Sequence, residues 1–118
     1  MKKKNFFILS VLFILCACKS LTSVTSIEVN KSFVLGEGKH GSYSARIKNV
    51  GSDSIEVLII GTNKNSNSLG LLKVNQSATY QVLENNTVQF KNLSTSRNGI
   101  IEIKANGDTN LTMGYKNN

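Results

Sequence analysis

The sequence predicts an all-β fold in which short antiparallel strands pack face to face as a sandwich. From Leu21 onward, apolar residues alternate with polar ones at a period close to two, which is the pattern of half-buried strands. Turn-forming residues interrupt these runs at intervals of roughly 8–12 residues, as in sandwiches and small barrels. After the leader, no stretch of the sequence keeps the 3.6-residue period of an amphipathic helix.

The first half of the body predicts three strands. Apolar and polar residues alternate in residues 26–30 and, more clearly, in residues 42–48, so a half-buried strand is expected in each. Residues 54–60 begin by alternating and end as Val-Leu-Ile-Ile. This ending predicts a central strand that is covered on both faces.

The second half predicts further strands of the same kind. Short β-type runs occupy residues 69–74, 78–83 and 87–90, and alternation returns at residues 101–104 and 111–115. Roughly seven to nine short strands in one small domain favour an immunoglobulin-like or related antiparallel β-sandwich.

Turn signals separate the predicted strands. The best is Ala-Asn-Gly-Asp at residues 105–108, because Asn-Gly accepts the positive φ angles of a tight hairpin. Similar signals stand at residues 51–53, 85–86 and 97–99, and the glycine-rich residues 36–41 predict a flexible loop.

Length and charge indicate one small domain without affinity for nucleic acid. The chain has 118 residues and a formal net charge of +7, but three of its lysines lie in the leader. The remaining basic residues are scattered singly, whereas nucleic-acid binders concentrate Lys and Arg on one face. We expect residues 1–17 to be a signal peptide, residues 18–25 a lipidated N-terminus with a short tether, and residues 26–118 the β-sandwich domain.

The leader has the arrangement of a secretory signal. Three lysines at residues 2–4 precede the apolar run FFILSVLFIL at residues 6–15. This run is about half the length that a membrane-spanning helix needs.

Leu15-Cys16-Ala17-Cys18 resembles a bacterial lipobox, the cleavage site of lipoprotein precursors. The resemblance implies that Cys18 is the lipidated residue, that its sulfur carries a diacylglyceryl group, and that the new N-terminus is acylated, as with palmitate. The chain departs from the common pattern at Cys16, where alanine or serine is usual. The alternatives are ordinary cleavage near Ala17 and a disulfide or metal pair of the two cysteines.

The resemblance implies a cell-envelope protein that is attached to a membrane by its N-terminal lipid, since more than one acyl chain anchors a protein stably. Lys19 and Ser20 follow the cysteine, so no acidic inner-membrane retention signal is present. In a cell with two membranes we therefore expect the periplasmic face of the outer membrane.

The sequence offers no catalytic or metal-binding constellation. His40 is the one histidine; it lies in the glycine-rich loop near Glu37 and Ser42 and is expected to be an exposed loop residue. The glycine-rich loop lacks the Ser or Thr after Gly-Lys that a phosphate loop needs. With no thiol after Cys18, we expect no metal and no cofactor. The acidic residues lie singly in turns or on solvent faces: Glu28, Glu37, Asp53, Glu56, Glu84, Glu102 and Asp108.

Two further features bear on function. Asp53-Ser54-Ile55 resembles an O-glycosylation signal of some bacteria, which makes Ser54 a candidate glycosylation site, although a turn-to-strand junction explains it equally well. Four aromatic residues stand at strand positions that point inward, and core packing is expected of them. An outward-pointing one would indicate a glycan or peptide platform. These aromatic residues are Tyr43, Tyr80, Phe90 and Tyr115.

These observations favour a non-enzymatic accessory or binding lipoprotein whose partner is an envelope protein or a glycan. A structural subunit that assembles through sheet edges is the alternative, with residues 54–60 and 100–105 as its candidate edges. A small hydrolase that uses His40 or a carboxylate pair is a third possibility.

Overall fold

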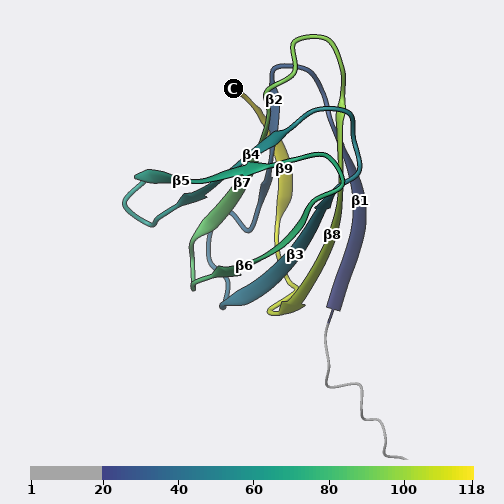
Figure 1. The fold of residues 1–118 in the computed structure, drawn as a ribbon. Helices are drawn as coiled ribbons and strands as arrows, with labels where there is room; N and C mark the ends of the chain where they lie inside the picture. The colour runs from purple at the N-terminus through teal and green to yellow at the C-terminus, as the bar shows by residue number, and fades with distance from the viewer. Residues whose placement is uncertain (1–19) are drawn as a thin grey trace, which may run out of the picture.

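The computed structural model describes residues 20–118, which form nine β-strands and no helix (Figure 1). The leader and Cys18 lie outside the described residues. The strands are β1 (Ser20–Ile27), β2 (Lys31–Leu35), β3 (Tyr43–Asn49), β4 (Ile55–Ile60), β5 (Ser66–Leu72), β6 (Ser77–Val82), β7 (Thr87–Asn92), β8 (Gly99–Gly107) and β9 (Met113–Asn117).

The strands form two antiparallel sheets that pack face to face (Figure 1). The first sheet has the order β1-β8-β3-β6, and the second has the order β5-β4-β7-β2-β9. The predicted all-β antiparallel sandwich is therefore confirmed.

The strand pairing is that of a jelly roll. β1 pairs with β8, β2 with β7, β3 with β6 and β4 with β5, as if one long hairpin had been rolled up into two sheets. β9 adds to the free edge of β2. In an immunoglobulin-like sandwich the first two strands share a sheet, whereas β1 and β2 lie in different sheets here. The fold is thus one of the related sandwiches that the sequence left open.

The core lies between the sheets, and every strand except β9 contributes at least one side chain to it. Burial alternates strictly in β3 and β8, where every second residue is buried and its neighbours face solvent. The core side chains are Ile27, Phe33, Leu35, Tyr43, Ala45, Ile47, Ile55, Val57, Leu72, Val82, Val88, Phe90, Ile101, Ile103 and Ala105.

The sandwich begins earlier than the sequence predicts. Residues 20–25 belong to β1, which pairs with β8 from Ser20 opposite Asn106 to Ile27 opposite Gly99. The predicted tether over residues 18–25 is therefore wrong from Ser20 onward. The polar residues of this segment hid a strand because one of its faces is solvent-exposed and its backbone groups are satisfied by β8.

β2 was not predicted from the sequence, and the strand predicted over residues 26–30 runs across the turn that precedes β2. Ser32, Phe33, Val34 and Leu35 are all buried, so the strand shows no alternation to read. The chain turns between β1 and β2 at Asn30, which has a positive φ of 62°.

The two segments predicted as free edges are interior strands. β4 lies between β5 and β7, and β8 lies between β1 and β3, so assembly through residues 54–60 or 100–105 is wrong. The apolar end of β4 is only half-buried at Leu58, Ile59 and Ile60, so the predicted cover on both faces is incomplete.

Candidate functional site

His40 is a buried structural residue, not the exposed loop histidine that the sequence predicts. Its side chain is 8% exposed and packs edge-on against Tyr43. Its Nδ1 lies 2.6 Å from the carbonyl oxygen of Gly41, and its Nε2 lies 2.7 Å from that of Asn86. Both ring nitrogens thus face backbone carbonyls, and neither is directed at a serine hydroxyl as a general base would be.

The glycine-rich loop is held by hydrogen bonds at both of its ends. The Gly36 amide donates to the carbonyl of Thr112 at 2.8 Å, and the Glu37 amide donates to the Thr112 hydroxyl at 2.9 Å. At its other end, the Gly41 amide donates to the Asp108 carboxylate at 2.6 Å. The loop serves to close one end of the sandwich against the segment between β8 and β9.

The acidic residues of the described chain are dispersed. Within residues 20–118, no group of three or more His, Cys, Asp or Glu side chains is placed to hold a metal ion. Glu28 pairs with Lys31 at 3.5 Å, and Glu56 accepts a hydrogen bond from the Ser68 hydroxyl at 2.9 Å. Ser54 is half-buried and lines a shallow polar depression with the loop between β7 and β8.

Of the four aromatic residues, one is not in the core. Tyr43 and Phe90 are buried, and Tyr80 is half-buried against the core. Tyr115 is 57% exposed, so core packing is wrong for this residue. The reason is that β9 extends the second sheet beyond β2, while the first sheet ends at β1.

Tyr115 nevertheless has a fixed position. It lies opposite Phe33 in the register of β9 and β2, and the two rings meet edge-on with centroids 5.5 Å apart. An aromatic side chain that is held on one side and open on the other offers a rigid apolar surface at low entropic cost.

A cavity of about 330 Å³ opens beside this ring. Its other lining residues are polar: Ser26, Glu28, Lys31 and Asn98. A hydroxyl, a carboxylate, an ammonium and an amide thus converge next to one aromatic ring. Hydrogen-bonding groups beside an aromatic ring can orient a small polar ligand that also has an apolar face. We refer to Tyr115 and these four residues as the Tyr115 site.

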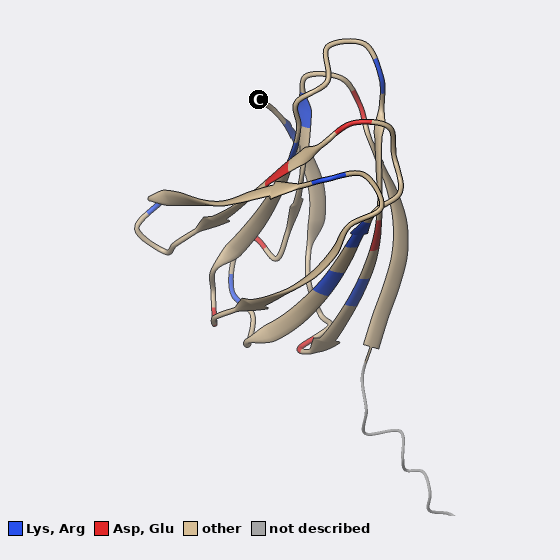
Figure 2. Cartoon of the chain, viewed as in Figure 1, with Lys and Arg blue, Asp and Glu red and all other residues tan. Residues whose placement is uncertain are grey.

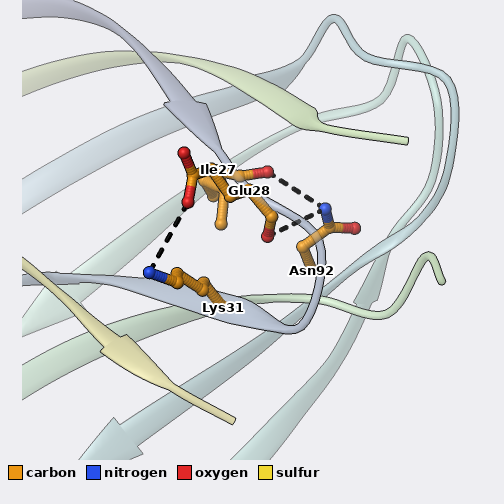
Figure 3. Close-up of polar contacts among 4 residues, drawn as sticks. All are labelled: Ile27, Glu28, Lys31 and Asn92. Carbon is orange, nitrogen blue, oxygen red and sulfur yellow. Dashed lines mark hydrogen bonds and ion pairs between the residues drawn. The ribbon is translucent and has the colours of Figure 1, made fainter. Parts of the chain in front are cut away.

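A buried asparagine fixes the polar side of the Tyr115 site. The Asn92 side-chain amide donates to the carbonyl of Ile27 at 3.0 Å and to that of Glu28 at 3.4 Å (Figure 3). The same amide donates to the carbonyl of Arg97 at 2.9 Å, next to Asn98. One side chain therefore holds both the turn that carries Glu28 and the loop that carries Asn98. Figure 3 also shows the ion pair of Glu28 with Lys31 across that turn.

The Tyr115 site and the start of the described chain lie at opposite ends of β1. Ser20 begins the strand, and Ser26 lies near its end. Six steps of roughly 3.3 Å each place Ser26 about 20 Å along the strand from Ser20.

Comparison with protein-family models, with curated proteins and with solved structures finds no match to this chain. No helix in residues 20–118 is long and apolar enough to cross a membrane.

Proposed function

We propose that this chain is a non-enzymatic binding lipoprotein of the bacterial cell envelope that takes a saccharide at the Tyr115 site. The observation that carries the proposal is the exposed, laterally supported ring of Tyr115 beside four hydrogen-bonding side chains. Sugar rings present apolar C–H faces that stack on an aromatic ring, and their hydroxyls pair with carboxylate, amide and ammonium groups.

The position of the site suits an anchored protein. In this proposal Cys18 carries the lipid, and the sandwich begins only two residues later at Ser20. The Tyr115 site then stands at the end of β1 that is farther from the anchor, where a ligand approaches from the space beyond the membrane. We place the protein on the periplasmic face of the outer membrane.

Binding is tested with tetrasaccharides of glucose and of N-acetylglucosamine by isothermal titration calorimetry on residues 18–118. We expect at least one of them to bind and Tyr115→Ala to weaken its affinity about tenfold or more, which corresponds to about 1.4 kcal/mol. Tyr115→Phe keeps the ring and should retain most of the affinity. Met113→Ala, on the same strand and also exposed, is the matched control. Equal affinities for Tyr115→Ala and the parent protein would contradict the proposal.

The anchor is tested separately. Mass spectrometry of the N-terminal peptide from the membrane fraction should find an acylated Cys18 as its first residue, and Cys18→Ser should release the protein from the membrane. An unmodified N-terminus upstream of Cys18 would remove the lipoprotein part of the proposal and leave the Tyr115 site unaffected.

A further inference from the structure

The outer face of the first sheet concentrates positive charge that the sequence scatters. Arg46 and Lys48 on β3 and Lys104 on β8 all point to solvent, and they come together because β3 and β8 are neighbours. Figure 2 shows these basic positions side by side on the two strands. The basic residues are scattered singly along the sequence, but the fold brings these three together on one face.

The register of the sheet brings like charges directly opposite each other. Arg46 pairs with Lys104 across β3 and β8, where Cβ atoms lie roughly 5 Å apart. Like charges in such a position destabilise a sheet. Among residues 20–118, no carboxylate lies within ion-pair distance of either side chain, since the ion pair in this range joins Lys31 and Glu28. The repulsion between Arg46 and Lys104 destabilises the free protein, and an anion bound between the two side chains would relieve it.

These residues line a groove of about 440 Å³. Thr22 and Val24 of β1 form one side, Arg46 and Lys48 form the other, and Glu102 and Lys104 lie between them. Three cations against one carboxylate leave two positive charges in the groove. We refer to this feature as the sheet groove.

Glu102, the single carboxylate that lines the sheet groove, indicates which class of anion would bind there. Glu102 lies opposite Lys48 on one side and Val24 on the other, in the middle of the sheet groove. It would repel a bilayer surface or a chain of uniform negative charge. It is, however, a strong acceptor for a sugar hydroxyl, and Val24, which is 69% exposed, offers an apolar contact for a sugar ring.

We propose that the sheet groove binds an acidic saccharide, a sugar chain whose carboxylates are held by Arg46 and Lys104 while its hydroxyls donate to Glu102. The guanidinium of Arg46 is suited to a bidentate carboxylate contact, and Lys104 adds a second charge from the facing strand. This site lies on a different surface from the Tyr115 site, and neither proposal depends on the other.

The test uses as its probe a tetrasaccharide in which glucuronic acid alternates with neutral N-acetylglucosamine, with calorimetry on residues 18–118 at low and at physiological salt. We expect the tetrasaccharide to bind, with lower affinity at higher salt, and the double variant Arg46→Gln/Lys104→Gln to bind at least tenfold more weakly. The control Lys39→Gln/Lys73→Gln removes the same charge from two exposed lysines outside the groove and should change the affinity less than twofold. Absence of binding, or an equal loss in both double variants, would overturn the proposal.

Glu102→Gln decides between an acidic saccharide and a bare anion. If Glu102 accepts a sugar hydroxyl, this variant binds the tetrasaccharide more weakly although it is more positive. Tighter binding by the variant, or preference of the parent protein for phosphatidylglycerol vesicles or inorganic phosphate over the tetrasaccharide, would refute the saccharide assignment. Tyr115→Ala should leave this binding unchanged, so failure of the Tyr115 site and failure of the sheet groove are told apart.

Discussion

Single buried polar residues hold the loops of this small sandwich together. Asn49 and Asn92 do so in the same way at the ends of β3 and β7. In each, the side-chain oxygen accepts from the amide two residues on, and the side-chain nitrogen donates to carbonyls of other segments. Both side chains are fully or almost fully buried, so each saturates several backbone groups that water cannot reach.

Tyr43 predicts how stability depends on alkaline pH. Burial raises the pKa of its phenol above the usual value of 10.0, and its hydroxyl donates to the carbonyl of Leu35. Above pH 10 the unfolded chain loses this proton while the folded protein keeps it, so the stability contribution is complete below pH 10 and is lost as pH rises further.

Urea denaturation at pH 8 to 11 measures this effect. The free energy of unfolding should fall above pH 10, and Tyr43→Phe should reduce the slope, by at most about 1.4 kcal/mol per pH unit. At pH 8 the variant should lose about 1 kcal/mol with the hydrogen bond. The control is Tyr115→Phe, which removes a phenol hydroxyl from a side chain that is 57% exposed. Parallel curves for Tyr43→Phe and the parent protein would show that another group titrates.

The residues of the Tyr115 site were only partly visible in the sequence. The expectation that an outward aromatic residue would mark a glycan platform led to Tyr115, but its exposure follows from the position of β9 at the edge of the second sheet, which no local pattern reveals. His40 was misread for a similar reason. Its burial depends on Asn86, a residue 46 positions away in the chain.

The connections between the sheets repeat one turn. Three of them contain a four-residue turn in which the amide of the fourth residue donates a hydrogen bond to the carbonyl of the first. The third residue of each turn is an asparagine with a positive φ. These asparagines are Asn30, Asn75 and Asn85. Type II turns require a positive φ at this position, which glycine and asparagine accept at least cost. The turn at residues 85–86 was therefore predicted correctly. The turns at Asn30 and Asn75, where a single asparagine follows a valine, were not predicted.

Lys64 adopts the same kind of backbone without the suitable side chain. Its φ is 72° in the turn between β4 and β5, where its amide donates to the carbonyl of Gly61 at 2.9 Å. A left-handed conformation costs a residue such as lysine about 1 kcal/mol relative to glycine. We expect Lys64→Gly to raise the free energy of unfolding by up to about 1 kcal/mol, measured by urea denaturation.

The turn asparagines supply the matched comparison. Asn75→Gly should be nearly neutral, and Asn75→Ala should destabilise by about 1 kcal/mol, because alanine has neither the conformational freedom nor the polar side chain. If alanine and glycine have equal effects at residue 75, backbone strain is not what selects the residue in these turns.

The alternation of apolar and polar residues predicted a strand correctly wherever one face of that strand is exposed to solvent, as in β3 and β8. It failed in β2, which is buried on both faces. It also failed at the start of β1, where the inward residues are mostly polar. The class of fold could therefore be predicted from periodicity, but the order of the strands could not, because it depends on pairings between distant segments.

The topology of the whole molecule indicates an order of folding. Only β4 and β5 are joined by a short turn and paired directly, while β3–β6, β2–β7 and β1–β8 close progressively longer loops around them. Long loops cost more entropy to close, and proteins dominated by such pairings fold in milliseconds to seconds. We therefore expect the β4–β5 hairpin and its neighbours to form in the transition state and β1 to dock last.

Two matched substitutions test this order. Ile55 in β4 and Ile27 in β1 are both completely buried, and changing either to valine removes one methylene at a cost of about 1 kcal/mol. In stopped-flow measurements over a range of urea concentrations, Ile55→Val should slow folding and give a φ-value above about 0.5. Ile27→Val should instead accelerate unfolding, with a φ-value near zero. Equal φ-values, or a higher one at Ile27, would mean that the outer pair β1–β8 is already formed at the barrier. The sandwich would then fold from its ends inward and not from the central hairpin outward.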